Sequence, residues 1–179
     1  SKAIHSFGQG CEGEPLTEAG TIASAVADFR SRGGRGTVNV NTNASRPETM
    51  EELARAGVDS IRVSINSFTE PFYTAYYRPK GYAFDQVIES IKRAKQAGLH
   101  VSLNYLFFPG ISDTEMEFEH LSQTISEYKV DFIQLRNMNL DPELYLSLAD
   151  QHISGPAMGF VNFRKRLRKA CPWLGLGYF

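Results

Sequence analysis

Short apolar runs alternate with amphipathic segments along most of this chain. Strand patterns, which either alternate in polarity or are rich in β-branched residues, cover 3–8, 37–43, 60–66, 101–106 and 131–137. Helical periodicity covers 17–32, 45–57, 84–97 and 112–128, and weaker helical patterns follow at 142–150 and 159–170. Strands that alternate with amphipathic helices are typical of βαβ units, so the pattern predicts a parallel sheet.

Two helix starts and one irregular segment stand out locally. Ser45–Glu48 and Ser112–Glu115 have the Ser-x-x-Glu spacing of capping boxes, which predicts that a helix begins at each. The segment 68–82 holds six aromatic residues and has no clear period. We expect it to be irregular, and either to wall a substrate site or to pack over the rim of the sheet.

The number of strands sets the fold class. A complete (β/α)₈ barrel needs about 250 residues, whereas this chain has 179. Five clear strands, with a sixth left open, predict an α/β fold, namely a partial (β/α) barrel of TIM type with parallel strands. The chain starts in a strand, so we expect that a first barrel unit is missing from it. We expect one domain over 1–179, with a weaker C-terminal extension from about residue 143.

Composition and charge exclude several classes of protein. With 42% hydrophobic and 22% charged residues, the chain has the balance of a folded domain. Its net charge of −1 provides no basic field for nucleic acid, and the basic cluster at 164–169 fits a solvated helix face. No apolar stretch reaches the roughly 20 residues of a membrane span. We therefore expect a cytoplasmic protein with neither a membrane nor a nucleic-acid partner.

Polar side chains gather where the predicted strands end. They are Asn39, Asn41, Asn43, Ser64, Asn66, Asn104, Gln134, Arg136 and Asn137. In parallel α/β folds, ligands bind at the carboxyl ends of the strands. Because amides both donate and accept hydrogen bonds, such a ring suits a polar, largely uncharged ligand such as a ribose or an amino acid. The alternative is that asparagine simply tolerates the turn after each strand.

The first strand leads into a glycine-rich segment, Phe7-Gly8-Gln9-Gly10-Cys11-Glu12-Gly13-Glu14-Pro15-Leu16. Its three glycines allow close backbone approach or positive φ. Glu14 precedes Pro15, which favours an extended conformation that presents the carboxylate to an ammonium group. The alternative is a tight turn with Glu12 and Glu14 in solvent and Pro15 near the start of the helix.

Gly13-Glu14-Pro15 resembles the Gly-Gly-Glu-Pro element of the radical S-adenosylmethionine (radical SAM) superfamily, although Glu12 replaces the first glycine. Thr42-Asn43-Ala44 is similar to the Thr-Asn-Gly that often ends the family's next strand. Arg62-Val63-Ser64-Ile65-Asn66-Ser67 is similar to the Arg-Val-Ser-Leu-Asp-Ser of the strand after it. Tyr77 to Tyr82 and Phe108 to Asp113 also follow the family's layout, and the match stays in register from Ser6 to about Pro142.

The resemblance implies a role for each matching position on the SAM methionine and ribose. Glu14 would accept a hydrogen bond from the SAM ammonium, supported by the backbone from Gly10 to Gly13. Ser64 and Asn66 would contact the carboxylate or the ribose.

The resemblance also places the other strand ends around the ligand. Asn41 and Asn43 would line the pocket near the methionine or the substrate, and Asn104 would face the ribose or the substrate. The residues expected near the adenine are Phe108, Pro109, Gly110, Gln134 and Asn137.

The resemblance further implies an enzyme with a [4Fe–4S] cluster. Such an enzyme reductively cleaves SAM to methionine and a 5′-deoxyadenosyl radical, which removes hydrogen from a substrate. The family holds its cluster with a Cys-x₃-Cys-x₂-Cys loop, whereas this chain has only Cys11 and Cys171. We therefore expect no metal ligand in this chain, a cluster only in the full-length parent, and no radical chemistry from the chain alone. The substrate, a small molecule or a peptide, stays open.

Two other functions remain as alternatives. A metal-free or phosphate-binding (β/α) barrel lyase or aldolase is disfavoured because no strand end carries a lysine, a histidine pair or a glycine-rich phosphate loop. A cluster-less, non-catalytic domain that binds a nucleotide or a partner is favoured by the missing cysteines. With an earlier unit missing, the first strand would expose a sheet edge, so we expect homo-oligomers through that edge.

Overall fold

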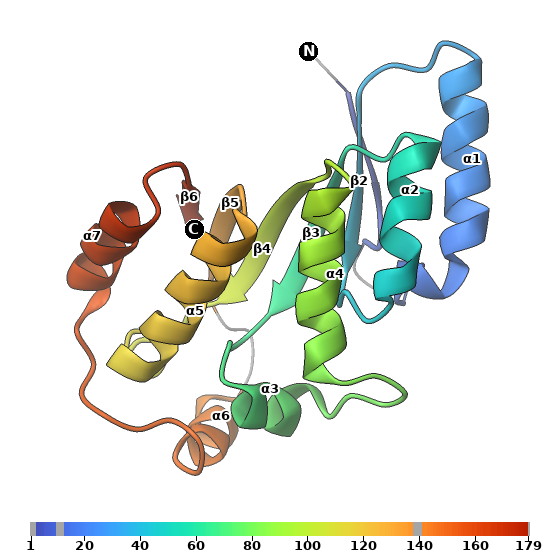
Figure 1. Cartoon of the computed structure of the whole chain (residues 1–179). Coiled ribbons are helices and arrows are strands. Elements are labelled where there is room, and N and C mark those ends of the chain that lie inside the picture. Colours follow the sequence, from blue (N-terminus) through green and yellow to red (C-terminus); the bar gives the residue numbers. More distant parts are fainter. Residues whose placement is uncertain (1–2, 10–12, 138–140, 179) are drawn as a thin grey trace. The chain divides into compact units, whose positions relative to one another are not determined.

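The computed structural model describes residues 3–9, 13–137 and 141–178. Its six strands are β1 (Ile4–Phe7), β2 (Thr37–Thr42), β3 (Ser60–Ile65), β4 (His100–Leu106), β5 (Phe132–Arg136) and β6 (Gly175–Tyr178). They form one parallel sheet in the order β1-β2-β3-β4-β5-β6 (Figure 1). Each strand lies beside its successor in the chain, which is the order of a (β/α) barrel rather than of a doubly wound sheet. The predicted fold class is confirmed, and the sixth strand exists.

Helices connect the strands, as the periodicity predicts. They are α1 (Ala19–Ser31), α2 (Met50–Ala56), α3 (Glu70–Tyr77), α4 (Phe84–Gln96), α5 (Glu115–Tyr128), α6 (Pro142–Ala149) and α7 (Phe160–Ala170), with 3-10 turns η1 (Pro15–Glu18) and η2 (Pro47–Thr49). The chain divides into two compact units. Unit 1 contains residues 1–64 and 85–102, and unit 2 contains 65–84 and 103–179. The single domain expected from the sequence stays a prediction.

In unit 1, α1 and α2 lie side by side along the strands (Figure 1). The apolar faces that the periodicity predicts are buried, with Ile22 and Val26 of α1 and Leu53 of α2 at most 7% exposed. Val40 of β2 and Ile61 of β3 are fully buried as well.

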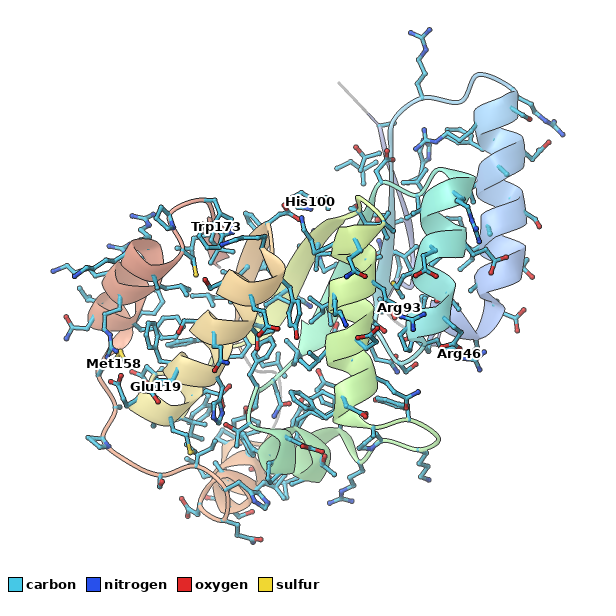
Figure 2. The ribbon with its side chains drawn as sticks, viewed as in Figure 1. Arg46, Arg93, His100, Glu119, Met158 and Trp173 are labelled. Atoms are coloured by element: carbon cyan, nitrogen blue, oxygen red, sulfur yellow. The ribbon has the colours of Figure 1, made fainter. Side chains whose placement is uncertain are left out.

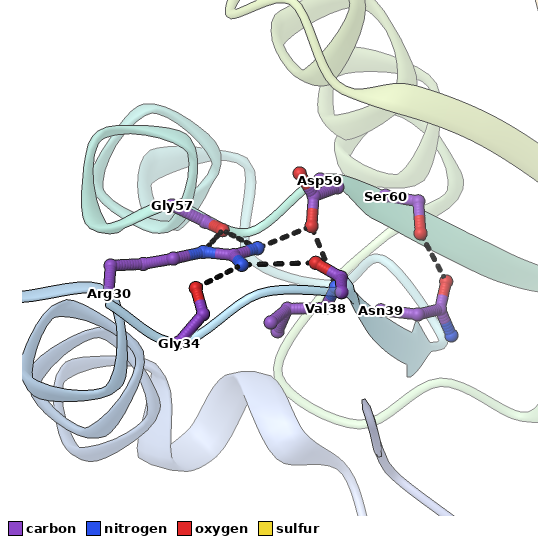
Figure 3. Close-up of polar contacts among 8 residues, drawn as sticks. Arg30, Gly34, Val38, Asn39, Gly57, Asp59 and Ser60 are labelled. Atoms are coloured by element: carbon purple, nitrogen blue, oxygen red, sulfur yellow. Dashed lines mark hydrogen bonds and ion pairs between the residues drawn. The ribbon is translucent and has the colours of Figure 1, made fainter. Parts of the chain in front are cut away.

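A polar clamp holds the amino ends of β2 and β3 (Figure 3). The Arg30 guanidinium donates to the carbonyl of Gly57 at 2.9 and 3.1 Å and to that of Gly36 at 3.0 Å. It also pairs with Asp59 at 2.6 Å, and the same Asp59 oxygen accepts from the Val38 amide at 2.7 Å. Gly57 has φ +102°, which ends α2 in the left-handed region that favours glycine.

In unit 2, aromatic rings pack α7 against α5 and against the residue that follows β4. The ring of Phe163 lies 5.1 Å from that of Phe107 and 5.8 Å from that of Phe118, centroid to centroid. Trp173 lies next to β6 (Figure 2), where its indole N–H donates to the carbonyl of Val130 at 3.1 Å and the ammonium of Lys129 sits 4.0 Å from its ring centroid.

Three local expectations were wrong. Neither Ser45 nor Ser112 caps a helix, since α2 begins through η2 and the Ser112 hydroxyl instead accepts from the Phe108 amide at 2.9 Å. The segment 68–82 is not irregular throughout, because α3 occupies Glu70–Tyr77. Its helical period is hidden because aromatic residues occupy several faces, although Thr69 before Glu70-Pro71 is a recognisable helix start.

Candidate functional site

Glu14 holds the end of β2 in unit 1. Its backbone is extended, with φ −86° and ψ 112°, as predicted from Pro15. One carboxylate oxygen accepts from the Thr42 hydroxyl at 2.5 Å and from the Leu16 amide at 3.0 Å, and the other accepts from the Asn43 amide at 2.7 Å. The alternative that Glu14 extends freely into solvent is therefore wrong. A carboxylate has about four acceptor positions, and its contacts with the described residues use three of them.

The amides of β2 have protein partners. Asn41 donates to the carbonyl of Phe7 at 3.1 Å and accepts from the Asn39 amide at 3.1 Å. Asn39 in turn accepts from the Ser60 hydroxyl at 2.8 Å (Figure 3). These bonds tie β1, β2 and β3 together, so both amides have a structural role whatever else they contact.

The remaining predicted positions of unit 1 are more open. The side-chain oxygen of Asn43 accepts from the Ser45 amide at 3.0 Å, an Asx turn of the kind that the turn alternative predicted. Ser64 is half-buried near the end of β3. Gly13 has φ +82° and is exposed, and Gly10 lies outside the described residues.

Asn66, in unit 2, directly follows β3 and differs from the β2 amides. It is 1% exposed, and neither its Nδ2 nor its Oδ1 has a hydrogen-bond partner among the described residues. The Oδ1 atom of Asn104 in β4 is also buried without a hydrogen-bond partner among the described residues. Buried polar atoms are nearly always hydrogen-bonded, because each unpaired one costs about 1–3 kcal/mol. These orphaned atoms fit a polar ligand at the ends of β3 and β4.

Tyr145 of α6 joins this part of the site, and the sequence analysis missed it. Its hydroxyl is also buried without a partner among the described residues, and its ring centroid lies 5.4 Å from that of Phe108. Burial raises the pKa of Tyr145 well above the ordinary tyrosine range, and the neighbouring Asn66 amide opposes that rise. The hydroxyl therefore stays protonated and available as a donor. The structure thus brings two predicted contacts, Asn66 and Phe108, together around Tyr145.

The turn after β4 shapes the other predicted positions. The Gly110 amide donates to the Asp113 carboxylate at 2.7 Å, and Pro109 and Gly110 are exposed. Gln134 is half-buried in β5, and Asn137 is exposed just beyond it. Within unit 2, α3 and α6 also line a cavity of about 440 Å³, whose walls include Tyr76, Tyr77, Arg78 and Tyr145.

A buried glutamate on α5 was also missed. Glu117 is 1% exposed and accepts hydrogen bonds from the loop that follows Asn66. A signal was available, since Glu117 precedes Leu121 and Ile125 at helical spacing on the buried face of α5.

Neither a metal site nor a membrane helix is found among the described residues. They contain no group of three or more His, Cys, Asp or Glu side chains that could hold a metal ion. Cys171 is a buried free thiol, and Cys11 lies outside the described residues. The donor set therefore does not fit a [4Fe–4S] cluster, which three thiolates would have to hold. In the same residues, every helix is too short or too polar to cross a membrane.

Known proteins resemble the chain in sequence and in fold. The profile of the radical SAM superfamily matches residues 7–121. A GTP 3′,8-cyclase from Thermodesulfovibrio yellowstonii is 31% identical over 123 residues, which cover 68% of this chain and 38% of the cyclase. The chain thus spans less than half the length of this relative.

Two solved structures share the fold. A domain of a pyruvate-formate lyase-activating enzyme from Bacteroides vulgatus has a TM-score of 0.64 at 13% identity, covering 100% of this chain and 99% of that one. Streptococcus suis SuiB, bound to S-adenosylmethionine, has a TM-score of 0.58 at 15% identity, covering 93% of this chain and 38% of SuiB. Because the family profile covers more than half of the chain, the protein belongs to the radical SAM superfamily.

Proposed function

We propose that this chain is the SAM-binding part of a radical SAM enzyme. The observation that carries the proposal is the buried amide of Asn66, whose donor and acceptor have no partner among the described residues. It follows β3 at the position where the family resemblance expects a contact to SAM. Membership of the superfamily supports SAM-dependent radical chemistry in general.

Each side chain offers what one part of SAM requires. The Asn66 amide can donate to the SAM carboxylate or exchange hydrogen bonds with ribose hydroxyls. Phe108 and the ring of Tyr145 offer an apolar face of the kind that suits an adenine. In unit 1, the contacts of Glu14 with the described residues use three of its acceptor positions, and the family resemblance expects the SAM ammonium at this carboxylate.

Bound to a reduced cluster held elsewhere, which would donate one electron, SAM would supply a carbon radical that removes hydrogen from a substrate. The chain's two cysteines cannot provide three thiolates. We therefore propose that the chain by itself binds SAM without cleaving it, and that radical chemistry requires cluster ligands from outside these 179 residues.

Isothermal titration of the protein with SAM tests this function. We expect Asn66→Ala to weaken SAM binding about tenfold, the size of one lost hydrogen bond to a charged group. Asn162→Ala, which removes an exposed amide of α7, is the matched control and should leave binding unchanged. Equal SAM affinity in the wild type and Asn66→Ala would refute the proposed site.

The second candidate is a cluster-less domain that binds a nucleotide or a protein partner, and the count of two cysteines favours it. Titration with adenosine and ATP beside SAM separates the two. Binding that depends on the methionine part of SAM supports the first function. Equal affinity for adenosine and SAM supports the second.

A further inference from the structure

The loop that follows β3 is tied to α5 by a single side chain. The Glu117 carboxylate accepts from the Ser67 hydroxyl at 2.7 Å and from the Thr69 hydroxyl at 2.9 Å on one oxygen. Its other oxygen accepts from the Phe68 amide at 2.7 Å and from the Tyr105 hydroxyl at 3.0 Å. Three consecutive residues of the loop therefore converge on one carboxylate nearly 50 positions away in the sequence.

The chemistry of this cluster restricts it to one arrangement. Glu117 is 1% exposed, and it acts only as an acceptor toward four neutral donors. Burial, and then the negative charge of Glu117, raise the pKa of Tyr105 well above the ordinary tyrosine range, so Tyr105 keeps its proton and donates. Burying a carboxylate costs free energy unless its acceptor positions are filled. A loop conformation that removed these donors would therefore be unfavourable.

Asn66 is the residue immediately before this loop, and its own side chain is not held. Both its amide atoms lack partners among the described residues, although it is buried. The direction in which the amide points therefore depends on the backbone that Glu117 holds. We propose that Glu117 is a positioning residue, which orients the Asn66 amide toward the ligand by holding the β3 loop through Ser67, Phe68 and Thr69. The inference rests on the proposed function of Asn66.

The test is a double-mutant cycle of Glu117→Gln and Asn66→Ala, with SAM affinity measured by titration calorimetry. Glutamine retains one acceptor oxygen for Phe68 and Tyr105, and its amide can donate to the hydroxyl oxygens of Ser67 and Thr69, so this variant should fold. We expect Glu117→Gln to weaken SAM binding about tenfold, and the double variant to be no weaker than Asn66→Ala alone. The matched control is Glu119→Gln, an exposed glutamate on the same helix (Figure 2).

NMR separates a positioning role of Glu117 from a general loosening of the fold. The Asn66 side-chain amide gives a pair of ¹H–¹⁵N signals that Asn66→Ala identifies by their loss. Without SAM, we expect Glu117→Gln to shift this pair while the signals of β5 and β6 keep their positions, and Glu119→Gln to shift none of them. Should Glu117→Gln fail to fold, Thr69→Val removes one donor to the carboxylate and should shift the pair and weaken SAM binding in the same direction.

The outcomes distinguish the inference from the function on which it rests. If Asn66→Ala leaves SAM affinity unchanged, the proposed site is wrong. If Asn66→Ala weakens binding but folded Glu117→Gln does not, only the positioning role is wrong. Independent, additive losses in the double variant would also overturn it, because Glu117 would then act on SAM binding by another route.

Discussion

The carboxyl ends of β2 and β3 are each held by a glutamate carboxylate, but the asparagines there are in opposite states. At β2, Glu14 is half-buried, and Asn41, near the end of the strand, has its amide bonded to other parts of unit 1. After β3, Glu117 is almost fully buried, and the adjacent Asn66 has an amide with no partner among the described residues. The same structural device therefore produces a closed network in one region and an open polar site in the other.

This difference shows which strand end is organised for a ligand. Amides that already bond to one another, as those of Asn39 and Asn41 in β2 do, gain less from a ligand than a buried amide without a partner. A loop that is rigidly held, yet leaves a buried amide unpaired, carries a cost that a ligand can remove.

The largest effect is expected from Glu117→Ala. It would leave four donors without their acceptor in a buried site, and we expect a loss of roughly 3–5 kcal/mol in the free energy of unfolding. Urea denaturation followed by circular dichroism measures it. A loss below about 1 kcal/mol would mean that water reaches these donors, and the contrast in burial between the two glutamates would then not hold.

Glu14→Ala should cost less, about 1–2 kcal/mol, because the Glu14 carboxylate is only half-buried and accepts from three donors rather than four. The same denaturation experiment compares the two alanine variants directly. A loss equal to that of Glu117→Ala would show that the two carboxylates stabilise their loops equally.

Asn66→Leu and Asn41→Leu form a matched pair with opposite expected signs. The Asn66 amide has no hydrogen-bond partner among the described residues, so leucine of similar size should raise the unfolding free energy by about 1 kcal/mol while it removes SAM binding. Asn41→Leu should lower the free energy of unfolding by about 1 kcal/mol, because this substitution breaks two hydrogen bonds. Thermal melts show whether each substitution raises or lowers stability. If both lower it, the Asn66 amide has hydrogen-bond partners in the folded chain.

The smallest effect concerns Glu115, an exposed carboxylate on the same helix as Glu117. Its two oxygens each pair with the Arg166 guanidinium at 2.5 Å, and this hydrogen bonding lowers the pKa of Glu115. A lowered folded-state pKa stabilises the fold above the ordinary carboxyl pKa, and this contribution is lost as the pH falls through the lowered value. Arg166→Gln should return the Glu115 pKa toward its ordinary value in an NMR titration, with little change in stability at pH 7. An unchanged pKa would mean that the pair does not form in solution.

Local sequence patterns predicted most of the elements and placed polar residues at the strand ends. They failed where several patterns overlap, as in α3, whose aromatic residues occupy more than one helix face. They also failed at Ser112, whose hydroxyl bonds to the Phe108 amide instead of capping α5. At Ser112, a contact within the turn after β4 outweighs the local preference for a helix cap.

The sequence by itself determined the alternation of strands and helices, the carboxylate before Pro15 and the amides at the strand ends, because these depend on periods and motifs a few residues long. Only the tertiary structure decided which amides are already bonded and which are buried without a partner. It also revealed Glu117 and Tyr145, since Glu117 meets Thr69 across 48 positions of sequence and Tyr145 meets Phe108 through packing of α6 in unit 2. Hydrogen-bond satisfaction depends on partners brought together by the fold, which is why no local pattern could predict it.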